Sequence, residues 1–420
     1  MPQKELMELL IAEFWERGIP DLTQRDRVFH KVQKKIHVAI GMRRSGKTFF
    51  LFQKIESLLE KGVPKNRILY LQLDDERILP LNGKELGQMV DAFYSLYPKN
   101  HEDICYLFFD EIQNVSEWSH TIRRLLDTKK AEIYLTGSSA KLLSKEIATS
   151  LRGRSLATEI YPFSFKEYYR HVSKTISDKP RSPKQRDMLQ KDLESFLING
   201  GFPEISKLQD SADRKNILQE YLNVTVYRDI VERHSITNIN LLKYFVSILV
   251  GNMGNPFTVN KCFNDLKSQG FSLGKDTLYD YLEFTQDCYL VFPVKIFSDS
   301  IRKQNINPRK IYIIDPGLFC ANIICSSPPW GRLFENLVFL DLMRAGHEVA
   351  YYLTRDNGFE VDFVTKSSRG EHCLYQVCWD ITDNKTRERE DRALQQASQD
   401  LGIKGEIITP ANYFDFLSNI

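Results

Sequence analysis

The sequence predicts an α/β protein in which helices cover a parallel β-sheet and further domains follow. Two observations predict the sheet. An apolar segment at residues 36–40 leads directly into a glycine-containing turn and a helical pattern, and apolar stretches alternate with helical stretches through residues 31–165. The third observation is length, because 420 residues exceed one ordinary hydrophobic core and predict two to four domains.

The first strand runs into GMRRSGKT at residues 41–48, which fits the phosphate-binding pattern GxxxxGK[ST] at every fixed position. A strand that ends in such a loop and opens a helix points backbone N–H groups and the helix dipole at phosphates. A chance match in a glycine-rich turn is the alternative, and the flanking strand and helix patterns disfavour it. We therefore expect ATP here, with Gly41 and Gly46 allowing close approach and Lys47 reaching the β- and γ-phosphates. The other expected ATP-binding residues are Arg43, Arg44, Ser45, Thr48 and Phe49.

The next functional segment is CYLFFDE at residues 105–111, an apolar strand pattern that ends in two carboxylates. We expect Asp110, with the Thr48 hydroxyl, to hold Mg²⁺, and Glu111 to activate the attacking water as general base. This pair favours ATP hydrolysis over passive binding. A solvated acidic pair after a strand is the alternative.

Two further elements follow in the order that an oligomeric ATPase needs. A strand at 132–135 precedes Thr-Gly-Ser-Ser, where a hydroxyl can sense the γ-phosphate, and we choose Ser138 over Ser139. The later segment SLRGRS carries Arg152 and Arg154, which are placed to reach a neighbouring subunit's nucleotide as a catalytic arginine. The alternative is an ordinary pair of surface arginines at a helix end.

The chain resembles the AAA-type ATPases, a branch of the P-loop AAA+ class, whose C-terminal half is the domain of unknown function numbered 4143. The resemblance covers nearly the whole chain. It rests on GMRRSGKT, LFFDEIQNV, LTGSS, LRGRS followed by YPFSFKEY, GGFPE, YRDIVERH, KIYIIDPGL and GRLFENLVF. It implies that Gly201 and Pro203 form a lid turn beside the adenine, whereas the residues of GGFPE alone indicate a helix stop and a tight turn.

The expected fold is therefore an AAA+ parallel sheet with a helical lid, followed by a winged helix-turn-helix and a degenerate PD-(D/E)XK-like α/β domain. The seven basic residues between Arg170 and Lys191 predict a solvated linker before the lid, with a nucleic-acid contact as the alternative. The expected boundaries are 1–30 for an N-terminal helical segment, 31–165 for the core, 166–236 for the lid, 237–316 for the winged helix and 317–420 for the last domain.

Residues 240–316 have the order helix, helix, turn, helix, strand, strand, which resembles a winged helix-turn-helix. Acidic residues lie along the expected second helix and would repel phosphate. The segment IRKQNINPRK has no acid, so the wing is the better candidate for a backbone contact. The expected DNA contacts are Lys275, Arg302, Lys303, Arg309 and Lys310. An equally weighted alternative is a winged helix that contacts a protein partner.

The last hundred residues resemble the restriction-endonuclease-like fold. Glu335 lies on a helix pattern, Asp362 on a strand, and the next strand carries Gln376 and Cys378. An active member needs a second acid and a lysine where Gln376 and Cys378 stand, because these groups bind Mg²⁺ and position water. We expect an inactive domain that only binds; an active nuclease in which Lys385 substitutes for the lysine is the minor alternative.

Composition limits the function classes. Lys and Arg number 57 against 55 Asp and Glu, so the net charge of +2 indicates no bias toward nucleic acid over the whole chain. Seven scattered cysteines predict reduced thiols, not disulfides or a zinc site. No apolar run approaches membrane-spanning length and the N-terminus does not resemble a signal peptide, so we expect a cytoplasmic protein without a membrane partner.

These observations together lead to one expected function and one rival. We expect Mg²⁺-dependent ATP hydrolysis by a self-associating ATPase, with a hexameric ring as one candidate, that binds or remodels DNA, including branched DNA. The rival is a nucleotide-dependent signalling or scaffold ATPase that acts on a protein partner. The DNA hypothesis depends on fold analogy for the two C-terminal modules.

Overall fold

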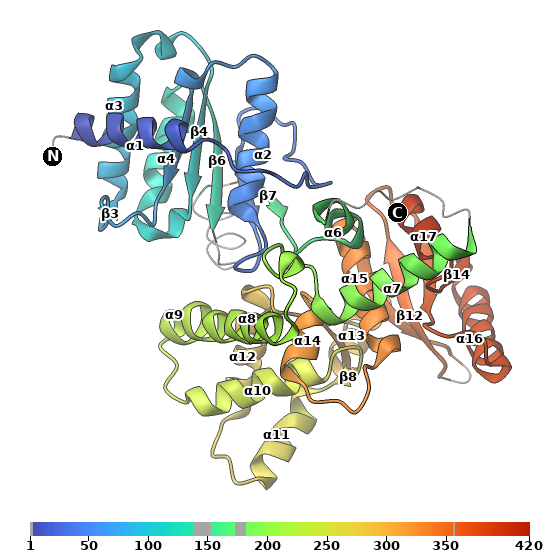
Figure 1. Ribbon diagram of the computed structural model, residues 1–420. Coiled ribbons are helices and arrows are strands. Elements are labelled where there is room, and N and C mark those ends of the chain that lie inside the picture. The colour runs from blue at the N-terminus through green and yellow to red at the C-terminus, as the bar shows by residue number, and fades with distance from the viewer. Residues whose placement is uncertain (1–2, 138–150, 152, 173–181, 356–357) are drawn as a thin grey trace. The chain divides into compact units, whose positions relative to one another are not determined.

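The computed structural model describes residues 3–137, 151, 153–172, 182–355 and 358–420 (Figure 1). The chain forms two compact units, Met1–Tyr161 and Pro162–Ile420. The first unit therefore ends close to residue 165, where the sequence predicts the end of the nucleotide-binding core.

The first unit is built on a five-stranded parallel sheet with the strand order β2-β4-β6-β1-β7. Parallel neighbours need crossover connections, and helices supply them, as the alternating sequence pattern predicts. In this order, β6 lies between β1, which leads into the phosphate loop, and β4, which ends at Asp110 just before Glu111. The strands are β1 (Ile36–Ile40), β2 (Ile68–Gln72), β4 (Cys105–Asp110), β6 (Ala131–Gly137) and β7 (Ser155–Glu159).

Helices cover this sheet and complete the unit. They are α1 (Gln3–Arg17), α2 (Lys47–Glu60), α3 (Gly83–Leu96) and α4 (Trp118–Thr128), and the short strands β3 (Leu81–Asn82) and β5 (Val115–Ser116) pair with each other. α3 begins with a capping box, in which Asn82 and Glu85 exchange side-chain to backbone hydrogen bonds of 3.0 Å. Aromatic side chains dominate the core between sheet and helices, and Phe14, Phe29, Phe50, Phe108 and Tyr134 are buried there together.

The second unit opens with helices, as the sequence predicts for a lid. They are α6 (Phe165–His171), α7 (Pro183–Asn199), α8 (Ser211–Val224) and α9 (Glu232–His234), with a π-helical segment, Thr225–Val231, joining α8 to α9. α7 starts at the Ser182 capping box and stops at Gly200, whose φ of 80° only glycine adopts readily. GGFPE is thus a helix stop and a turn.

A small three-stranded sheet follows in the order β8-β10-β9, with β10 antiparallel to both neighbours. Its elements run along the chain as helix, strand, helix, helix, strand, strand. They are α10 (Ile239–Gly251), β8 (Pro256–Phe257), α11 (Val259–Ser268), α12 (Lys275–Asp287), β9 (Val291–Val294) and β10 (Arg309–Ile313), and α13 (Ile301–Ile306) lies between the last two strands.

The C-terminal part of the second unit is a four-stranded sheet in the order β11-β12-β13-β14. The first three strands are antiparallel neighbours, whereas β13 and β14 are parallel and are connected through α16. The elements are α14 (Pro316–Asn322), α15 (Trp330–Arg344), β11 (Glu348–Leu353), β12 (Glu360–Lys366), β13 (His372–Val377), α16 (Asn384–Leu401), β14 (Gly405–Ile408) and α17 (Tyr413–Asn419). In the described part of the chain, no helix combines the length and apolarity that a membrane crossing requires.

Candidate active site

The loop between β1 and α2 has the backbone that a phosphate-binding turn requires. Gly41 has a φ of 150°, and a Cβ built on it would lie 2.2 Å from the carbonyl oxygen of Ile160. Gly46 has a φ of 98° and caps α2, so the chain turns directly into the helix. Both glycines are therefore needed for conformational reasons, as the sequence pattern predicts.

Lys47 is buried, and its ammonium lies inside the curve of this loop. Nζ donates hydrogen bonds to the carbonyl oxygens of Gly41, at 3.1 Å, and Met42, at 3.0 Å. Among the other expected ATP ligands, Ser45 is buried, Arg43 and Thr48 are half-buried, and Arg44 and Phe49 are exposed. The cation is thus placed where the loop's backbone encloses it.

Arg25 supports the loop from a segment that the sequence analysis assigned no role. Its buried guanidinium donates to the carbonyl oxygen of Ser45 at 3.0 Å and also to that of Tyr161. Gln53 on α2 accepts from the Arg25 backbone N–H at 2.7 Å. Arg25 lies twenty residues before Ser45 in a stretch without a recognisable motif, so no sequence signal indicates this contact.

Asp110 ends β4 in a buried position surrounded by hydroxyl donors. Tyr70 donates to its Oδ2 at 2.9 Å, Thr136 donates to its Oδ1, and the Thr48 side chain is also hydrogen-bonded to it. Burial raises the pKa of Asp110, and the hydrogen bonds from these hydroxyls oppose that rise. Thr48 and Asp110, the two residues expected to hold Mg²⁺, therefore lie within one hydrogen bond of each other.

Glu111 follows with a left-handed backbone, at a φ of 57°, that turns its side chain away from the strand direction. Its backbone N–H donates to Oγ1 of Thr136 at 2.9 Å, and its carboxylate accepts from the Gln113 amide. One hydroxyl, that of Thr136, thus contacts both acids. The sequence predicts a hydroxyl at this strand end and favours Ser138, which lies outside the described residues, as does Arg152.

Arg154 is exposed, and it pairs with an acid of its own unit. Its Nη1 lies 2.5 and 2.6 Å from the two carboxylate oxygens of Asp127, on α4. A pair between exposed side chains contributes little to stability. Arg154 can therefore exchange this partner for another anion at small cost.

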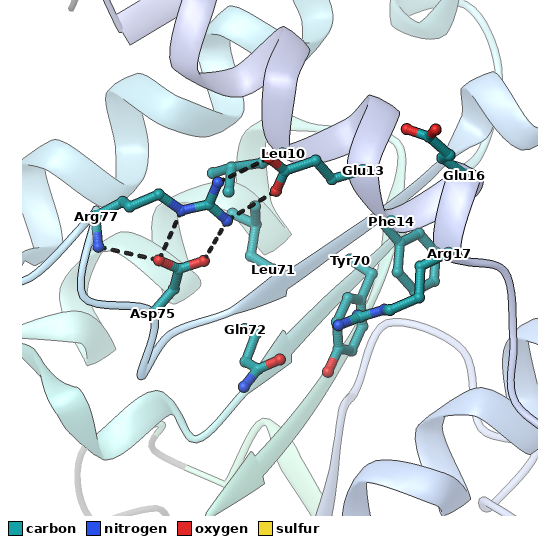
Figure 2. Close-up of a pocket in the computed structure, with 10 residues that line it drawn as sticks. All are labelled: Leu10, Glu13, Phe14, Glu16, Arg17, Tyr70, Leu71, Gln72, Asp75 and Arg77. Atoms are coloured by element: carbon teal, nitrogen blue, oxygen red, sulfur yellow. Dashed lines mark hydrogen bonds and ion pairs between the residues drawn. The ribbon is translucent and has the colours of Figure 1, made fainter.

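A cavity of about 410 Å³ lies beside α1 in the same unit (Figure 2). The Arg77 guanidinium bridges Asp75 and Glu13 across its wall, with an Nη2–Oδ2 distance of 2.7 Å to Asp75 and an Nη2–Oε2 distance of 2.8 Å to Glu13. Tyr70 also lines this cavity and is the residue that donates to Asp110. Tyr70 therefore belongs to the wall of the cavity and also donates a hydrogen bond to Asp110.

The turn containing Gly201 and Pro203 is fixed within the second unit. The Gly201 N–H donates to Asp315 Oδ2 at 2.6 Å, and a Cβ on Gly201 would lie 2.3 Å from the carbonyl oxygen of Phe163. Burial raises the pKa of Asp315 to about 7, while backbone N–H donors act in the opposite direction. The adenine contact of Gly201 and Pro203 remains a prediction.

The five expected DNA contacts do not share one environment. Lys275, Arg302 and Lys303 are exposed and Arg309 is half-buried. Lys310 differs: it is 2% exposed and forms ion pairs with three carboxylates of the second unit. A buried, fully paired ammonium is not on the surface to meet a phosphate, so the prediction for Lys310 was wrong.

Family comparisons agree with the geometry of the first unit. A family model described as an AAA domain matches residues 33–169, and a domain of unknown function, DUF8612, matches residues 190–327 in place of the expected domain 4143. The parallel sheet, the phosphate loop and this match define the nucleotide-binding part as an AAA domain of the P-loop class.

Relatives with long matches give the family. The chain is 39% identical over 394 residues to the uncharacterized protein MJ1544 of Methanocaldococcus jannaschii. This match covers 93% of this chain and 85% of MJ1544. An uncharacterized protein of Haemophilus influenzae is 29% identical over 351 residues, or 83% of this chain and 84% of that one. The chain belongs to the family of MJ1544.

A solved structure also aligns with the chain. It is the Walker-type ATPase paby2304 of Pyrococcus abyssi, at 15% identity, covering 73% of this chain and 99% of that one with a TM-score of 0.44. A score of this size is too low to support an argument about function.

Proposed function

We propose that the protein hydrolyses ATP with Mg²⁺ at the site formed by the phosphate loop and the acid pair. The observation that supports this most is the Thr136 hydroxyl, which contacts Asp110 and the backbone of Glu111 together. Asp110 is in turn hydrogen-bonded to Thr48 of the phosphate loop. The loop that would bind phosphates and the acids that would act on them are thus connected through direct contacts.

Each side chain has a role that follows from its chemistry. Backbone N–H groups of the loop and the Lys47 ammonium bind the phosphates and offset their negative charge. The oxygens of Thr48 and Asp110 suit Mg²⁺, a hard cation that prefers oxygen ligands and would offset charge on the transferred phosphoryl group. Glu111 takes the proton from the attacking water. Gln113 and Thr136 hold Glu111 in position through their hydrogen bonds to its carboxylate and its backbone N–H.

Two substitutions test this assignment. Lys47→Ala should abolish ATP binding, whereas Glu111→Gln should bind ATP normally and lose at least about a hundredfold in turnover, since only the base is removed. Glu117→Gln is a matched control, because Glu117 is an exposed glutamate with a similar backbone φ of 55°. Wild-type turnover in Glu111→Gln would show that Glu111 is not the base.

We propose further that the ATPase self-associates and that Arg154 or Arg152 completes a neighbour's site. The weak, exposed pair of Arg154 with Asp127 supports this for Arg154, since the guanidinium is accessible from outside the unit. An arginine supplied by a second subunit stabilises the charge that develops on the transferred phosphoryl group.

For the second unit we propose a winged helix-turn-helix that contacts DNA, followed by a restriction-endonuclease-like domain that does not cleave it. Support for the first part comes from the helix and strand order and from the exposed basic residues Arg302, Lys303 and the half-buried Arg309 around α13. These side chains would meet phosphates and not base edges, so binding should be insensitive to sequence and sensitive to salt.

A triple substitution of Arg302, Lys303 and Arg309 by Ala tests the DNA contact. If all three touch phosphates, the slope of log affinity against log salt should flatten by about 2.7, at about 0.9 per contact. A charge-matched control replaces three exposed lysines of the first unit, Lys61, Lys84 and Lys99. An unchanged slope in the first variant would favour the rival function, in which this module contacts a protein partner.

A further inference from the structure

Lys310 lies in β10, in the small three-stranded sheet, yet its side chain ends among acids of the C-terminal sheet. Nζ is 2.7 Å from Oε1 of Glu335, 2.6 Å from Oε1 of Glu360 and 2.8 Å from Oδ1 of Asp362. Glu335 comes from α15, and the other two acids come from β12. One ammonium therefore connects β10 to two elements of the last domain.

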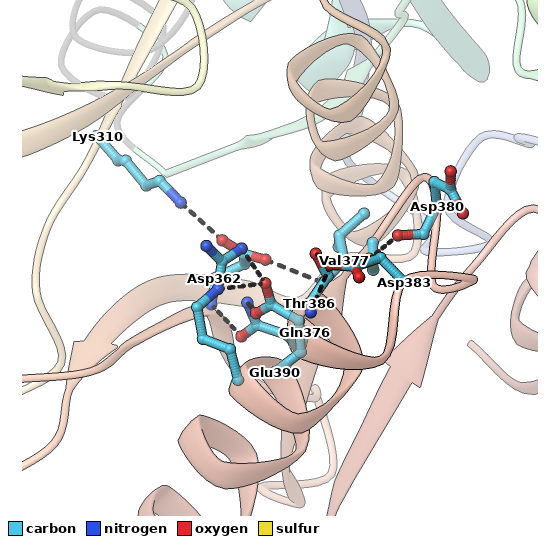
Figure 3. Close-up of polar contacts among 10 residues, drawn as sticks. Lys310, Asp362, Gln376, Val377, Asp380, Asp383, Thr386 and Glu390 are labelled. Atoms are coloured by element: carbon cyan, nitrogen blue, oxygen red, sulfur yellow. Dashed lines mark hydrogen bonds and ion pairs between the residues drawn. The ribbon is translucent and has the colours of Figure 1, made fainter.

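Further hydrogen bonds hold two of the carboxylates around this ammonium, and Figure 3 shows Asp362 between Lys310 and Val377. Tyr312, two residues after Lys310, donates to Glu335 Oε1 at 2.5 Å, and the backbone N–H of Val377 donates to Asp362 Oδ2 at 2.9 Å. The Gln376 amide accepts from the Asp362 N–H at 3.3 Å. The carboxylates of Glu335 and Asp362 are thus each held by a second donor besides the Lys310 ammonium.

Electrostatics favour a permanent charge at this position. Burial alone would lower the pKa of Lys310, but the carboxylates of Asp362, Glu335 and Glu360 outweigh burial and hold it well above its ordinary value. Breaking a buried pair by removing one partner leaves uncompensated charge and destabilises strongly. The lysine and the acids consequently depend on each other.

The Lys310 ammonium lies within hydrogen-bond distance of all three carboxylates. Separations of 2.6 to 2.8 Å are those of charge-assisted N–H···O bonds, whereas Mg²⁺ requires oxygens at about 2.0–2.1 Å. Within the described ranges, no group of three or more His, Cys, Asp or Glu side chains is arranged to hold a metal ion, and the three acids around Lys310 are included in that finding. A divalent cation would also be repelled by the ammonium.

We propose that Glu335, Glu360 and Asp362 form a cation site whose resident cation is the Lys310 ammonium, which keeps the C-terminal domain closed to divalent metal and ties it to β10. This inference concerns a different site from the proposed ATPase centre. It also gives the proposed absence of cleavage a cause that is independent of Gln376 and Cys378, because the Lys310 ammonium occupies the space between the acids that a metal ion would need.

Removal of the lysine side chain should convert the cluster into a divalent-metal site. We would titrate the nucleotide-free full-length protein with Mn²⁺ and measure free Mn²⁺ by electron paramagnetic resonance. Lys310→Ala should bind one more Mn²⁺ per chain than wild type, because three carboxylates then lack a counter-ion. The affinity for this additional Mn²⁺ should be at least about tenfold higher than any affinity of the wild-type protein at this position. Lys404→Ala removes an exposed lysine of the same unit that has no assigned role, so this variant is the control and should bind Mn²⁺ as wild type does.

The additional Mn²⁺ should disappear again in Lys310→Ala/Asp362→Asn. A folded Lys310→Ala protein without the additional Mn²⁺ would overturn the proposal. If that variant does not fold, lysine acetylation of the wild-type protein followed by mass spectrometry decides the question. Lys310 should then be at least about a hundredfold slower to react than Lys303 and should become reactive in Glu335→Gln/Asp362→Asn, since only the carboxylates hold the ammonium in the interior. Equal reactivity of Lys310 and Lys303 in the wild type would refute it.

Discussion

Thr136→Val is the substitution that most directly tests the architecture of the ATPase centre. Thr136 is fully buried, its hydroxyl donates to Asp110, and it accepts from the Glu111 N–H at 2.9 Å. Valine has nearly the same shape, so the change removes one hydroxyl without creating a cavity. Asp110 then loses a donor and the Glu111 N–H loses its acceptor.

The size of the effect follows from these two contacts. A hydrogen bond to a charged group contributes about 1.5–3 kcal/mol, and a buried N–H without a partner costs about 1–3 kcal/mol. Because both contacts share one hydroxyl, these costs do not add in full, and we expect the first unit to lose about 2–4 kcal/mol. Loss of the donor should also raise the pKa of Asp110 further, because the Thr136 hydrogen bond lowers it. Since both acids lose their common support, turnover should fall about a hundredfold.

A second threonine provides the matched control. Thr136 on β6 and Thr158 on β7 flank the same residue of β1, Ala39, in the sheet register, and Thr158 is 1% exposed. The Thr158 hydroxyl has no hydrogen-bond partner among the described residues. Thr158→Val therefore removes an equivalent hydroxyl from the same level of the sheet and should be neutral or slightly stabilising.

Hydrogen–deuterium exchange of peptides from β4 and β6 would measure the stability of the first unit alone. Amides that exchange only through unfolding of the unit should lose protection by a factor of about 30 to 1,000 in Thr136→Val. The same peptides should be unchanged in Thr158→Val. If the two variants agree within about 0.5 kcal/mol, which is the scatter of ordinary neutral substitutions, the Thr136 network does not stabilise the site and the reasoning fails.

Two further predictions concern assembly and pH. Arg154→Ala should lower ATP turnover about a thousandfold if this arginine acts in a neighbour's site. Mixing this variant with Lys47→Ala should restore part of the turnover. No recovery on mixing would exclude a role of Arg154 in a neighbour's site. Burial holds the pKa of His37 below its ordinary 6.5, so the unfolded chain binds the proton more readily and the first unit should lose stability as pH falls below 6.5. His37→Phe should flatten this dependence in denaturation curves taken between about pH 5 and 7; an unchanged slope would contradict the assignment.

The backbone of the phosphate-binding pattern can be predicted from the sequence because its requirements are local. Gly41, Gly46, Lys47 and Thr48 belong to one continuous turn, and their order follows from the geometry of a strand that becomes a helix. The position of Asp110 can also be predicted from the sequence, since an apolar run that ends in acids indicates the end of a buried strand. In the structure, Gly46 caps α2 and Asp110 ends β4, whereas the binding roles of these residues stay predictions.

The supporting contacts could not be predicted in the same way. Tyr70 and Thr136 reach Asp110 from strands 40 and 26 residues away, and no spacing rule connects these positions. Arg25 lies in a stretch with no periodic signal. Contacts of this kind depend on which side chains the sheet register brings to one edge, and a strand pattern does not specify the register between separate strands.

Lys310 shows a different limit. The segment IRKQNINPRK predicts a DNA contact for Lys310 together with Arg302, Lys303 and Arg309, because all four are cationic and no acid lies between them. The distinguishing signal is the apolar run IYII that follows it, which indicates a buried strand. A lysine at the start of such a strand requires an acidic partner from elsewhere in the fold, and only the tertiary structure identifies Glu335, Glu360 and Asp362 as those partners.

The insertion of β6 between β1 and β4 determines how much room a reaction has at the sheet's edge. Neighbouring strands lie about 4.8 Å apart, so the end of β1 and the end of β4 are separated by about 10 Å. Side by side, the two strands would bring lysine and acid into direct contact and leave no gap for a reactant. At two strand widths, the phosphate loop and Glu111 face each other across the end of β6, and the proposed reaction would place the transferred phosphoryl group and the attacking water in that interval, beside the Thr136 hydroxyl that contacts both acids.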